Sequence, residues 1–145
     1  MDDDEIDRFI KSTTQASRTC NQEAVQTLWS GYGNINRIEL VGAQFPSVII
    51  KYVQPGEGDH PRGWNTDLSH ERKLKSYRVE TQWYDRQRNR PSPILARIPK
   101  CIGLKSEGDE TLLVLEDLDV SGFAGRRSSV NQIEWQSCVR WLAAF

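Results

Sequence analysis

Short apolar runs alternate with polar segments along the chain, and their spacing predicts the secondary structure. Residues 3–18 carry Ile6, Phe9 and Ile10 at helical spacing, which predicts an amphipathic helix. Two later segments, at about 67–88 and at 129–145, also have helical spacing. Five further runs are short and rich in β-branched or aromatic residues, as is typical of strands. These runs lie at 25–29, 35–41, 47–53, 100–104 and 111–115.

Turn and cap signals separate these elements. Residues 54–66 hold two prolines and three glycines, which predicts a mobile loop. The segment 105–110 predicts a hairpin turn between the last two strands. Polar residues that favour helix N-caps precede the second and third helices. The candidates are Thr66 or Asp67 for the second helix and Ser128 or Ser129 for the third.

The predicted order of elements is α-β-β-β-α-β-β-α. Hairpin-connected strands with one helix inserted after the third predict an α+β fold, in which a five-stranded antiparallel sheet carries that helix on one face. We expect an N-terminal helical segment at 1–22 and the sheet with its helix at 23–118. A linker and a final helix follow at 119–145.

Lys51 is a cation inside the otherwise apolar run 47–53. Removing a cation from water costs several kcal/mol unless an anion pairs with it. The strand therefore lies either at a sheet edge, with Lys51 in water, or beside a buried anion.

Glu80 is the candidate anion. At about 100° per residue the second helix has one apolar face, formed by Leu74, Tyr77 and Tyr84. Glu80 lies within that face, where a carboxylate needs a partner. It pairs with Lys51 if this face packs on the sheet. If the helix is rotated, Glu80 pairs instead with water or with Lys73.

Gly31 and Gly33 lie in the turn at 30–34, between two predicted strands. This position fits a glycine loop that covers nucleotide phosphates, as in kinases, and it also fits a plain tight hairpin. It does not fit a Rossmann site, in which a helix follows the glycines. The chain has no GxxxxGK[ST] segment, which excludes a P-loop.

The last predicted strand, 111–115, runs directly into the acidic segment 116–119. An apolar strand that ends abruptly in acids resembles a hinge, whose backbone groups can hydrogen-bond a purine edge. Asp117 and Asp119 also have the spacing of a metal pair, although neighbouring acids on a connector are more often solvated.

Together these segments resemble the N-terminal lobe of the choline kinase and aminoglycoside phosphotransferase group, most closely its ecdysteroid-kinase-like branch. The resemblance extends over residues 20–145. The segments that carry it are 28–37, 49–51, 76–84, 98–101 and 113–118. It implies a kinase-like nucleotide-binding lobe at 23–118 and the start of a helical C-terminal lobe at 119–145.

The resemblance implies ATP as the cofactor and roles for residues at matching positions. Lys51 would hold the phosphates and Glu80 would orient Lys51, as the two catalytic residues. The other implied nucleotide contacts are Gly31, Tyr32 and Gly33 over the phosphates, the backbones of Glu116 and Leu118 at adenine, and Ile38, Ile49 and Leu115 around adenine.

The family's His-Gly-Asp segment, its downstream Asn and its metal-binding Asp have no match in the sequence. We expect the catalytic base and the Mg²⁺ ligands in a C-terminal lobe after Phe145. The predicted function is transfer of the γ-phosphoryl of ATP to a hydroxyl of a small molecule, with the chain inactive alone. The alternative is a non-catalytic, pseudokinase-like or truncated scaffold that binds a protein partner.

Composition adds few constraints. The net charge of −1 gives no pull toward nucleic acid or an anionic membrane, and no apolar run reaches the roughly 18 residues of a membrane helix. The acidic start differs from a signal peptide, which predicts a cytoplasmic protein. The apolar end at 141–145 indicates a fragment and a possible homodimer.

The residue types that most often bind metal are too scattered to predict a site. Cys20, Cys101 and Cys138 are far apart and match no metal-binding spacing, which predicts reduced, small apolar residues. Neither His60 nor His70 has a partner ligand nearby in the sequence.

Overall fold

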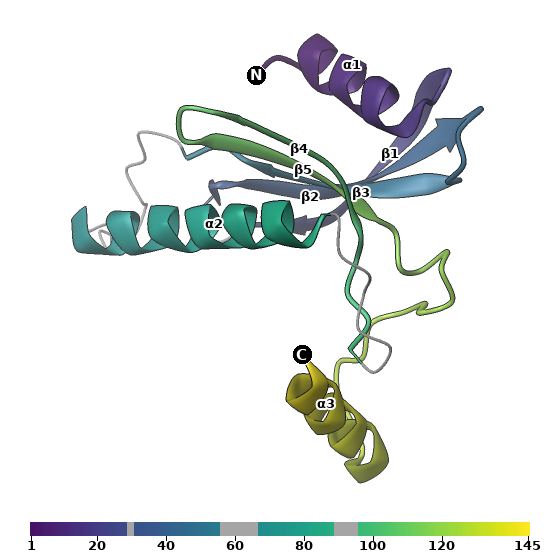
Figure 1. Ribbon diagram of the computed structural model, residues 1–145, viewed down its shortest axis with the longest axis vertical. Helices are drawn as coiled ribbons and strands as arrows, with labels where there is room; N and C mark the ends of the chain where they lie inside the picture. The colour runs from purple at the N-terminus through teal and green to yellow at the C-terminus, as the bar shows by residue number, and fades with distance from the viewer. Residues whose placement is uncertain (29–30, 56–66, 89–95) are drawn as a thin grey trace.

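The structure, a computed structural model, describes residues 1–28, 31–55, 67–88 and 96–145. Their elements follow the predicted order (Figure 1) and form an α+β fold. They are α1 (Asp3–Thr14), β1 (Arg18–Thr27), β2 (Gly33–Val41), β3 (Ser47–Val53), α2 (Asp67–Gln87), β4 (Cys101–Glu107), β5 (Glu110–Glu116) and α3 (Gln132–Ala144). All strand pairs are antiparallel. The sheet order is β1-β2-β3-β5-β4, so β3 is the central strand.

The bounds differ from the prediction mainly at the N-terminal end. The first helix ends at Thr14, because Gln15 adopts a left-handed conformation with φ of 59°. β1 begins at Arg18 instead of residue 25, so residues 18–22 belong to the sheet and not to a helical segment. The sequence signal was weak there, because β1 is mostly exposed and bulges interrupt its register with β2.

The predicted caps and the last hairpin also need correction. Asn131 caps α3 and forms a capping box with Glu134, so Ser128 and Ser129 are not its caps. β4 and β5 extend toward each other until the turn between them is Gly108 and Asp109 alone. The predicted loop at 54–66 and the candidate cap Thr66 lie largely or wholly outside the described residues.

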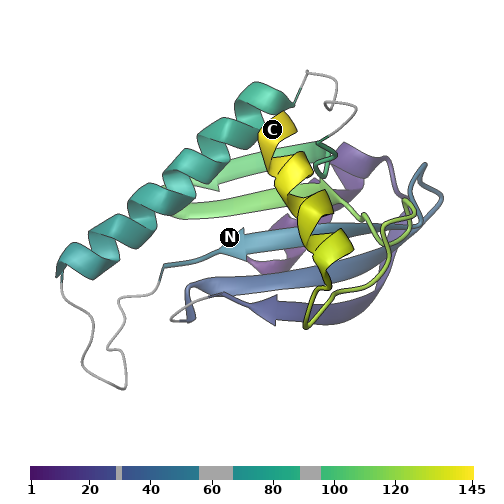
Figure 2. The ribbon, with the colours of Figure 1, turned by 90° about the horizontal axis from the view of Figure 1, so that it is seen from below.

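A helix covers each face of the sheet, α1 on one side and α2 on the other (Figures 1 and 2). We call these sides the α1 face and the α2 face. The α1 face holds the larger core cluster, in which Val48, Leu112 and Val114 are fully buried. The cluster on the α2 face is smaller and consists of Cys101, Leu113 and Leu115, with Tyr84 of α2 packed against it. The prediction of a helix on one face was therefore incomplete.

α3 lies on the same side of the sheet as α2 and further from it (Figures 1 and 2). Trp141 donates its indole N–H to the carbonyl of Arg97 over 2.9 Å, and Phe145 contacts Trp83 with ring centroids 5.4 Å apart. Several other apolar side chains of α3 are exposed, among them Ile133, Trp135 and Leu142.

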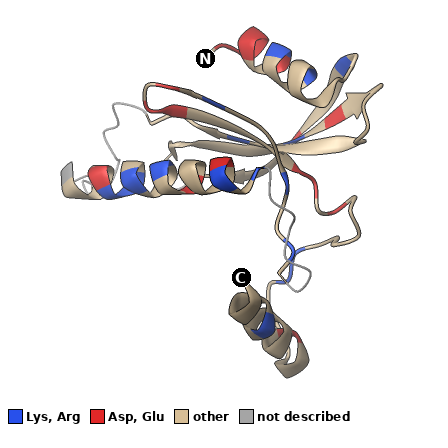
Figure 3. Ribbon diagram, in the orientation of Figure 1, with Lys and Arg blue, Asp and Glu red and all other residues tan. Residues whose placement is uncertain are grey.

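Figure 3 shows acidic residues at the start of α1 and both signs of charge interspersed along α2. Among the described residues, no helix has both the length and the apolar character that crossing a membrane would require.

Candidate functional site

Lys51 and Glu80 form an ion pair between the central strand and α2. The Lys51 ammonium donates to both carboxylate oxygens of Glu80, at 2.7 and 2.6 Å. The Lys51 side chain is 14% exposed and that of Glu80 is 33% exposed. β3 is flanked by β2 and β5, so the edge-strand alternative for Lys51 is wrong. The helix is oriented as its apolar face predicted, and Glu80 faces Lys51.

Two tyrosines of α2 enclose this pair. The Lys51 ammonium lies 5.5 Å from the centre of the Tyr77 ring, within the range of a cation–π contact. Tyr84, one helical turn beyond Glu80, packs on the cluster around Leu113. Burial, and to a smaller extent the Glu80 charge, raises the pKa of Tyr84 to about 12. Both effects, in the same order, also raise the pKa of Tyr77.

The hairpin between β1 and β2 requires its two glycines for different reasons. Gly33 has φ of +134°, and a Cβ there would lie 1.9 Å from the carbonyl oxygen of Tyr52 on β3. Gly31 has φ of +71°, but a Cβ there would meet open space. Gly33 is therefore fixed by strand packing, whereas at Gly31 only the backbone conformation favours glycine. Among the described residues, nothing other than its chain neighbours lies within 4 Å of a Cβ at that position.

Tyr32 connects this hairpin to α2. Its side chain is buried, and its hydroxyl lies 2.6 Å from Nδ1 of His70 in a hydrogen bond. The Tyr32 ring lies 6.3 Å from the Tyr77 ring, and Lys73 lies over it at 5.1 Å. The side chain of Tyr32 thus points between the hairpin and the helix, so any contact of this residue with phosphate falls to its backbone.

An apolar hollow lies beside the Lys51–Glu80 pair, between β2, β3 and the end of β5. Its volume is about 300 Å³. We call it the strand-end hollow, and its apolar lining is Val25, Ile35, Ile49, Pro99, Leu115, Leu118 and Phe123. Charged residues also belong to its wall, namely Arg37, Glu116, Asp117, Asp119 and Arg126. Ile35 pairs with Lys51 in the β2–β3 register, and Ile49 is two residues from Lys51 on the same strand. The hollow therefore adjoins the ion pair.

Ile38 was expected in this lining and does not belong to it. It pairs with Val48 and is part of the core on the α1 face. Side chains alternate between the two faces along a strand, so Ile38 and Ile49 cannot share a face when Arg37 is the residue opposite Ile49. Ile35 takes the expected place of Ile38.

Glu116 and Leu118 have part of their backbone already engaged. The N–H of Glu116 donates to the carbonyl of Lys100 over 2.9 Å. The carbonyl of Leu118 accepts from the N–H groups of Ser121 and Phe123, at 3.1 and 2.9 Å. Within the described residues, the groups left for a purine edge are therefore the carbonyl of Glu116 and the N–H of Leu118.

The side chains in this segment are held as well. Glu116 accepts from the side chain of Arg97, from the hydroxyl of Ser121 over 2.8 Å and from the N–H of Lys100 over 3.1 Å. Because Arg97 also accepts through its carbonyl from Trp141 of α3, these contacts connect the end of β5 to the last helix.

Asp117 is buried, with 2% of its side chain exposed, so the expectation of a solvated acid is wrong for this residue. It accepts from Nε of Arg37 and from the hydroxyl of Ser47, both at 2.7 Å. Burial pushes the pKa of Asp117 up, but the bonds from Arg37 and Ser47 outweigh burial and hold that pKa below its usual value.

Arg37 also pairs with Asp119, so one guanidinium engages both carboxylates of the supposed metal pair. The sequence reasoning passed over Arg37. The available signal was the same as for Lys51, because Arg37 occupies a strand position in phase with the apolar Ile35.

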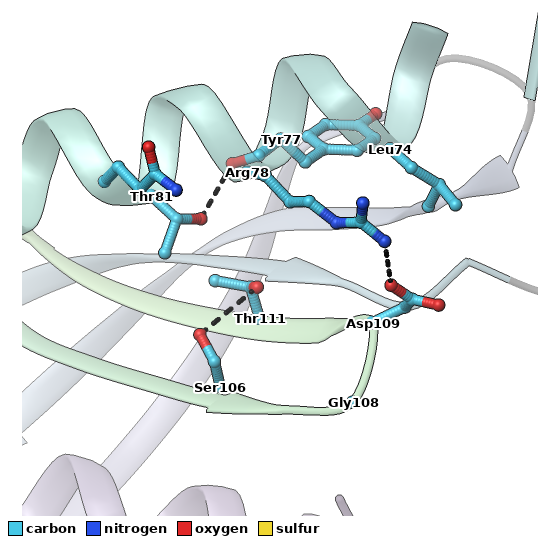
Figure 4. Close-up of a pocket in the computed structure, with 9 residues that line it drawn as sticks. Leu74, Tyr77, Arg78, Thr81, Ser106, Gly108, Asp109 and Thr111 are labelled. Carbon is cyan, nitrogen blue, oxygen red and sulfur yellow. Dashed lines mark hydrogen bonds and ion pairs between the residues drawn. The ribbon is translucent and has the colours of Figure 1, made fainter. Parts of the chain in front are cut away.

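A second, smaller hollow of about 170 Å³ lies between α2 and the β4–β5 hairpin (Figure 4). Leu74, Tyr77 and Thr81 line it from the helix, and Arg78 pairs with Asp109 across it at 2.9 Å. Tyr77 thus lines this hollow and also contacts Lys51.

Comparisons of the chain with protein-family models, with curated proteins and with solved structures gave no match.

Proposed function

We propose that residues 23–118 form the ATP-binding, kinase-like lobe of a phosphotransferase that phosphorylates a hydroxyl of a small molecule. The main support for this proposal is the ion pair in which Lys51 of the central strand donates to both carboxylate oxygens of Glu80 on α2. This ion pair lies beside the strand-end hollow. A largely buried cation held by a helix carboxylate next to such a hollow is a site prepared for an anion with an apolar or aromatic part.

The chemistry of phosphoryl transfer consists mainly of positioning and charge neutralisation. A lysine ammonium has three N–H donors. Glu80 takes two of them in this structure, which leaves one to donate to a phosphate oxygen. Glu80 therefore fixes the direction of the remaining N–H, and Lys51 supplies part of the charge that the phosphates need.

The strand-end hollow suits the base of the nucleotide. Its volume of about 300 Å³ is at the lower end of the range for ligand pockets. Ile49 and Leu115 provide apolar contacts to the ring, while the carbonyl of Glu116 and the N–H of Leu118 provide an acceptor and a donor. The phosphates then extend toward Lys51, under the hairpin of Gly31 and Gly33.

The catalytic base and the metal ligands belong to a second lobe in this proposal. The sequence holds no His-Gly-Asp segment, so a helical C-terminal lobe, beginning with α3, would supply the base and the ligands of Mg²⁺. The same lobe would hold most of the pocket for the alcohol substrate.

A scaffold without catalysis is the second candidate, and the exposed apolar side chains of α3 favour it. Ile133 is 73% exposed and Leu142 is 65% exposed. An exposed apolar surface of this kind marks a site of protein association, either with a partner or with a second copy of the chain.

The test is nucleotide binding and phosphoryl transfer by the full-length protein, with ATP and a panel of small alcohols. We expect Lys51→Ala to lower turnover by about 100-fold or more, as for other residues that stabilise developing charge, with the fold retained. Lys75→Ala, which removes an exposed lysine of α2, is the matched control. Undiminished turnover in Lys51→Ala would refute the assignment, and a wild-type protein that binds no nucleotide would favour the scaffold.

A further inference from the structure

We propose that Arg37 is a positioning residue that fixes the wall of the strand-end hollow and thereby sets its preference among nucleobases. This inference rests on the proposed function, because it concerns the same site. Arg37 lies on β2, opposite Ile49, and is itself part of the lining. No role follows for it from the resemblance described above.

Arg37 connects three separate parts of the chain. Its Nε donates to Oδ2 of Asp117 over 2.7 Å, one Nη pairs with Asp119, and the other donates to Glu23 of β1 over 2.9 Å. The hydrogen bonds that Arg37 donates to these carboxylates, led by Asp117, raise its pKa above the ordinary value, so it is charged at every accessible pH. The guanidinium is thus a permanent link between β2 and the segment after β5.

The carboxylates that Arg37 holds organise the segment that forms the wall. Asp117 also accepts from the hydroxyl of Ser47 and from the N–H of Asp119, at 2.7 and 3.1 Å. Asp119 in turn accepts from the N–H of Gly125 over 3.2 Å. Contacts therefore run from β2 through the turn at 117–119 to residue 125, across the stretch that holds Leu118 and Phe123.

Leu118 connects the contacts of Arg37 to the bound nucleobase. Its N–H is one of the two backbone groups left for a purine edge among the described residues, and its side chain lines the hollow. Moving the turn moves that donor relative to Ile49 and Leu115, which lie on strands and stay in place. The position of Arg37 therefore determines whether the donor meets an adenine or a different base edge.

This position requires the forked geometry of an arginine guanidinium. Arginine can bond two carboxylates at once in fixed directions, whereas lysine is a single point charge. Arg37→Lys keeps a cation beside the buried Asp117, so this variant should fold, but it cannot also hold Asp119. Asp119→Ala removes the carboxylate that accepts from Arg37 and from the N–H of Gly125, and it leaves the side-chain contacts of Asp117 in place. The Asp119 side chain is 43% exposed, so its loss should not disturb the core. Glu23→Gln is the matched control, since Glu23 contacts the same guanidinium from β1 and is 68% exposed.

The first measurement needs no nucleotide. Amide hydrogen exchange of the full-length protein should rise at residues 117–126 in Arg37→Lys and Asp119→Ala, and should stay unchanged in Glu23→Gln. Exchange at β3 and a melting temperature near that of the wild type show that the fold is intact. Unchanged exchange at 117–126 in both variants overturns the inference whatever the protein binds.

The second measurement is the Kd for ATP and for GTP. We expect the two variants to weaken ATP binding by about fivefold, because the wall must be ordered on binding, and to lower the ratio of ATP to GTP affinity. A purely structural role would lower stability without changing that ratio. Variants that keep the wild-type ratio overturn the inference and leave the proposed function intact. A wild-type protein that binds neither nucleotide overturns both.

Discussion

The two faces of the sheet are built from the same strands and differ in what covers them. On the α1 face, Ile10 of the helix is buried over a core of fully buried Val48, Leu112 and Val114. In the described part of α2, no side chain is fully buried, and a charged pair replaces apolar packing at the centre. The comparison indicates that the α1 face holds most of the apolar core, while the α2 face has a charged pair in place of apolar packing.

Glycine use shows the same difference. Gly103 on β4 has no side chain where Phe9 and Thr13 of α1 approach, and a Cβ there would lie 2.9 Å from Thr13. This glycine lets the helix pack closely on the sheet. At the hairpin over the other face, Gly31 faces open space. Gly103 thus permits close packing on the α1 face, whereas nothing among the described residues packs against Gly31.

The largest effect should come from the neighbouring leucines of β5. Leu112 points to the α1 face and Leu113 to the α2 face, and both are fully buried. We expect Leu112→Ala to cost about 4 kcal/mol of unfolding free energy and Leu113→Ala about 2 kcal/mol, because the loosely covered face can relax into the cavity. Urea denaturation measures both. Equal losses of unfolding free energy in the two variants would contradict the proposed difference in packing between the two faces.

The hairpin glycines come next in size. Gly33→Ala forces a Cβ onto the Tyr52 carbonyl, so we expect a loss of about 3 kcal/mol through strain between β2 and β3. Gly31→Ala pays only for its left-handed backbone, about 1 kcal/mol. Thermal unfolding compares the two. A Gly31 variant that keeps its stability and loses nucleotide affinity would sharpen the assignment of this hairpin to the site.

The dependence of stability on pH at the acid end should report on the buried Asp117. Its pKa in the folded protein lies below that in the unfolded chain, despite the opposing effect of burial. Its contribution to stability is therefore complete above the unfolded value of about 3.9 and is lost as the pH falls through the lower folded value. We expect Asp117→Asn to be less stable than the wild type at neutral pH and to lose less on acidification. Asp109→Asn, at the exposed pair with Arg78, should leave the acid profile unchanged.

The smallest effect on stability should come from the ion pair itself. Lys51 is only 14% exposed, but Glu80 is 33% exposed and the glutamine keeps a carbonyl oxygen that can accept from Lys51. We therefore expect Glu80→Gln to cost about 1 kcal/mol. Nucleotide affinity should nevertheless fall, because Lys51 loses its fixed direction. Isothermal titration with ATP and a thermal melt separate the two. A large loss of stability with unchanged affinity would mean that the pair serves the fold.

The sequence predicted most of this arrangement because its signals were local. Short apolar runs rich in β-branched residues indicated the four strands from β2 to β5, and helical spacing indicated α2 with the face that carries Glu80. β1 was predicted only in its last part, since most of its side chains are exposed and no apolar alternation marks its start. The cap of α3 was misplaced because several polar residues compete at 128–131, and only the backbone conformation selects Asn131.

The order of the helices and strands, and the unfavourable place of Lys51 within an apolar strand, could be predicted from local patterns of residues. Which residues pair with Lys51, and which side chains share a face of the sheet, depends on the folded structure. Ile38 was assigned to the site from its apolar character, yet the β2–β3 register puts it in the other core and brings Ile35 and Arg37 to the α2 face. Register depends on pairing between strands distant in sequence, and a shift of one residue exchanges the two faces. Asp117 and Asp119, which are 80 and 82 residues from Arg37, likewise meet it only when the sheet forms.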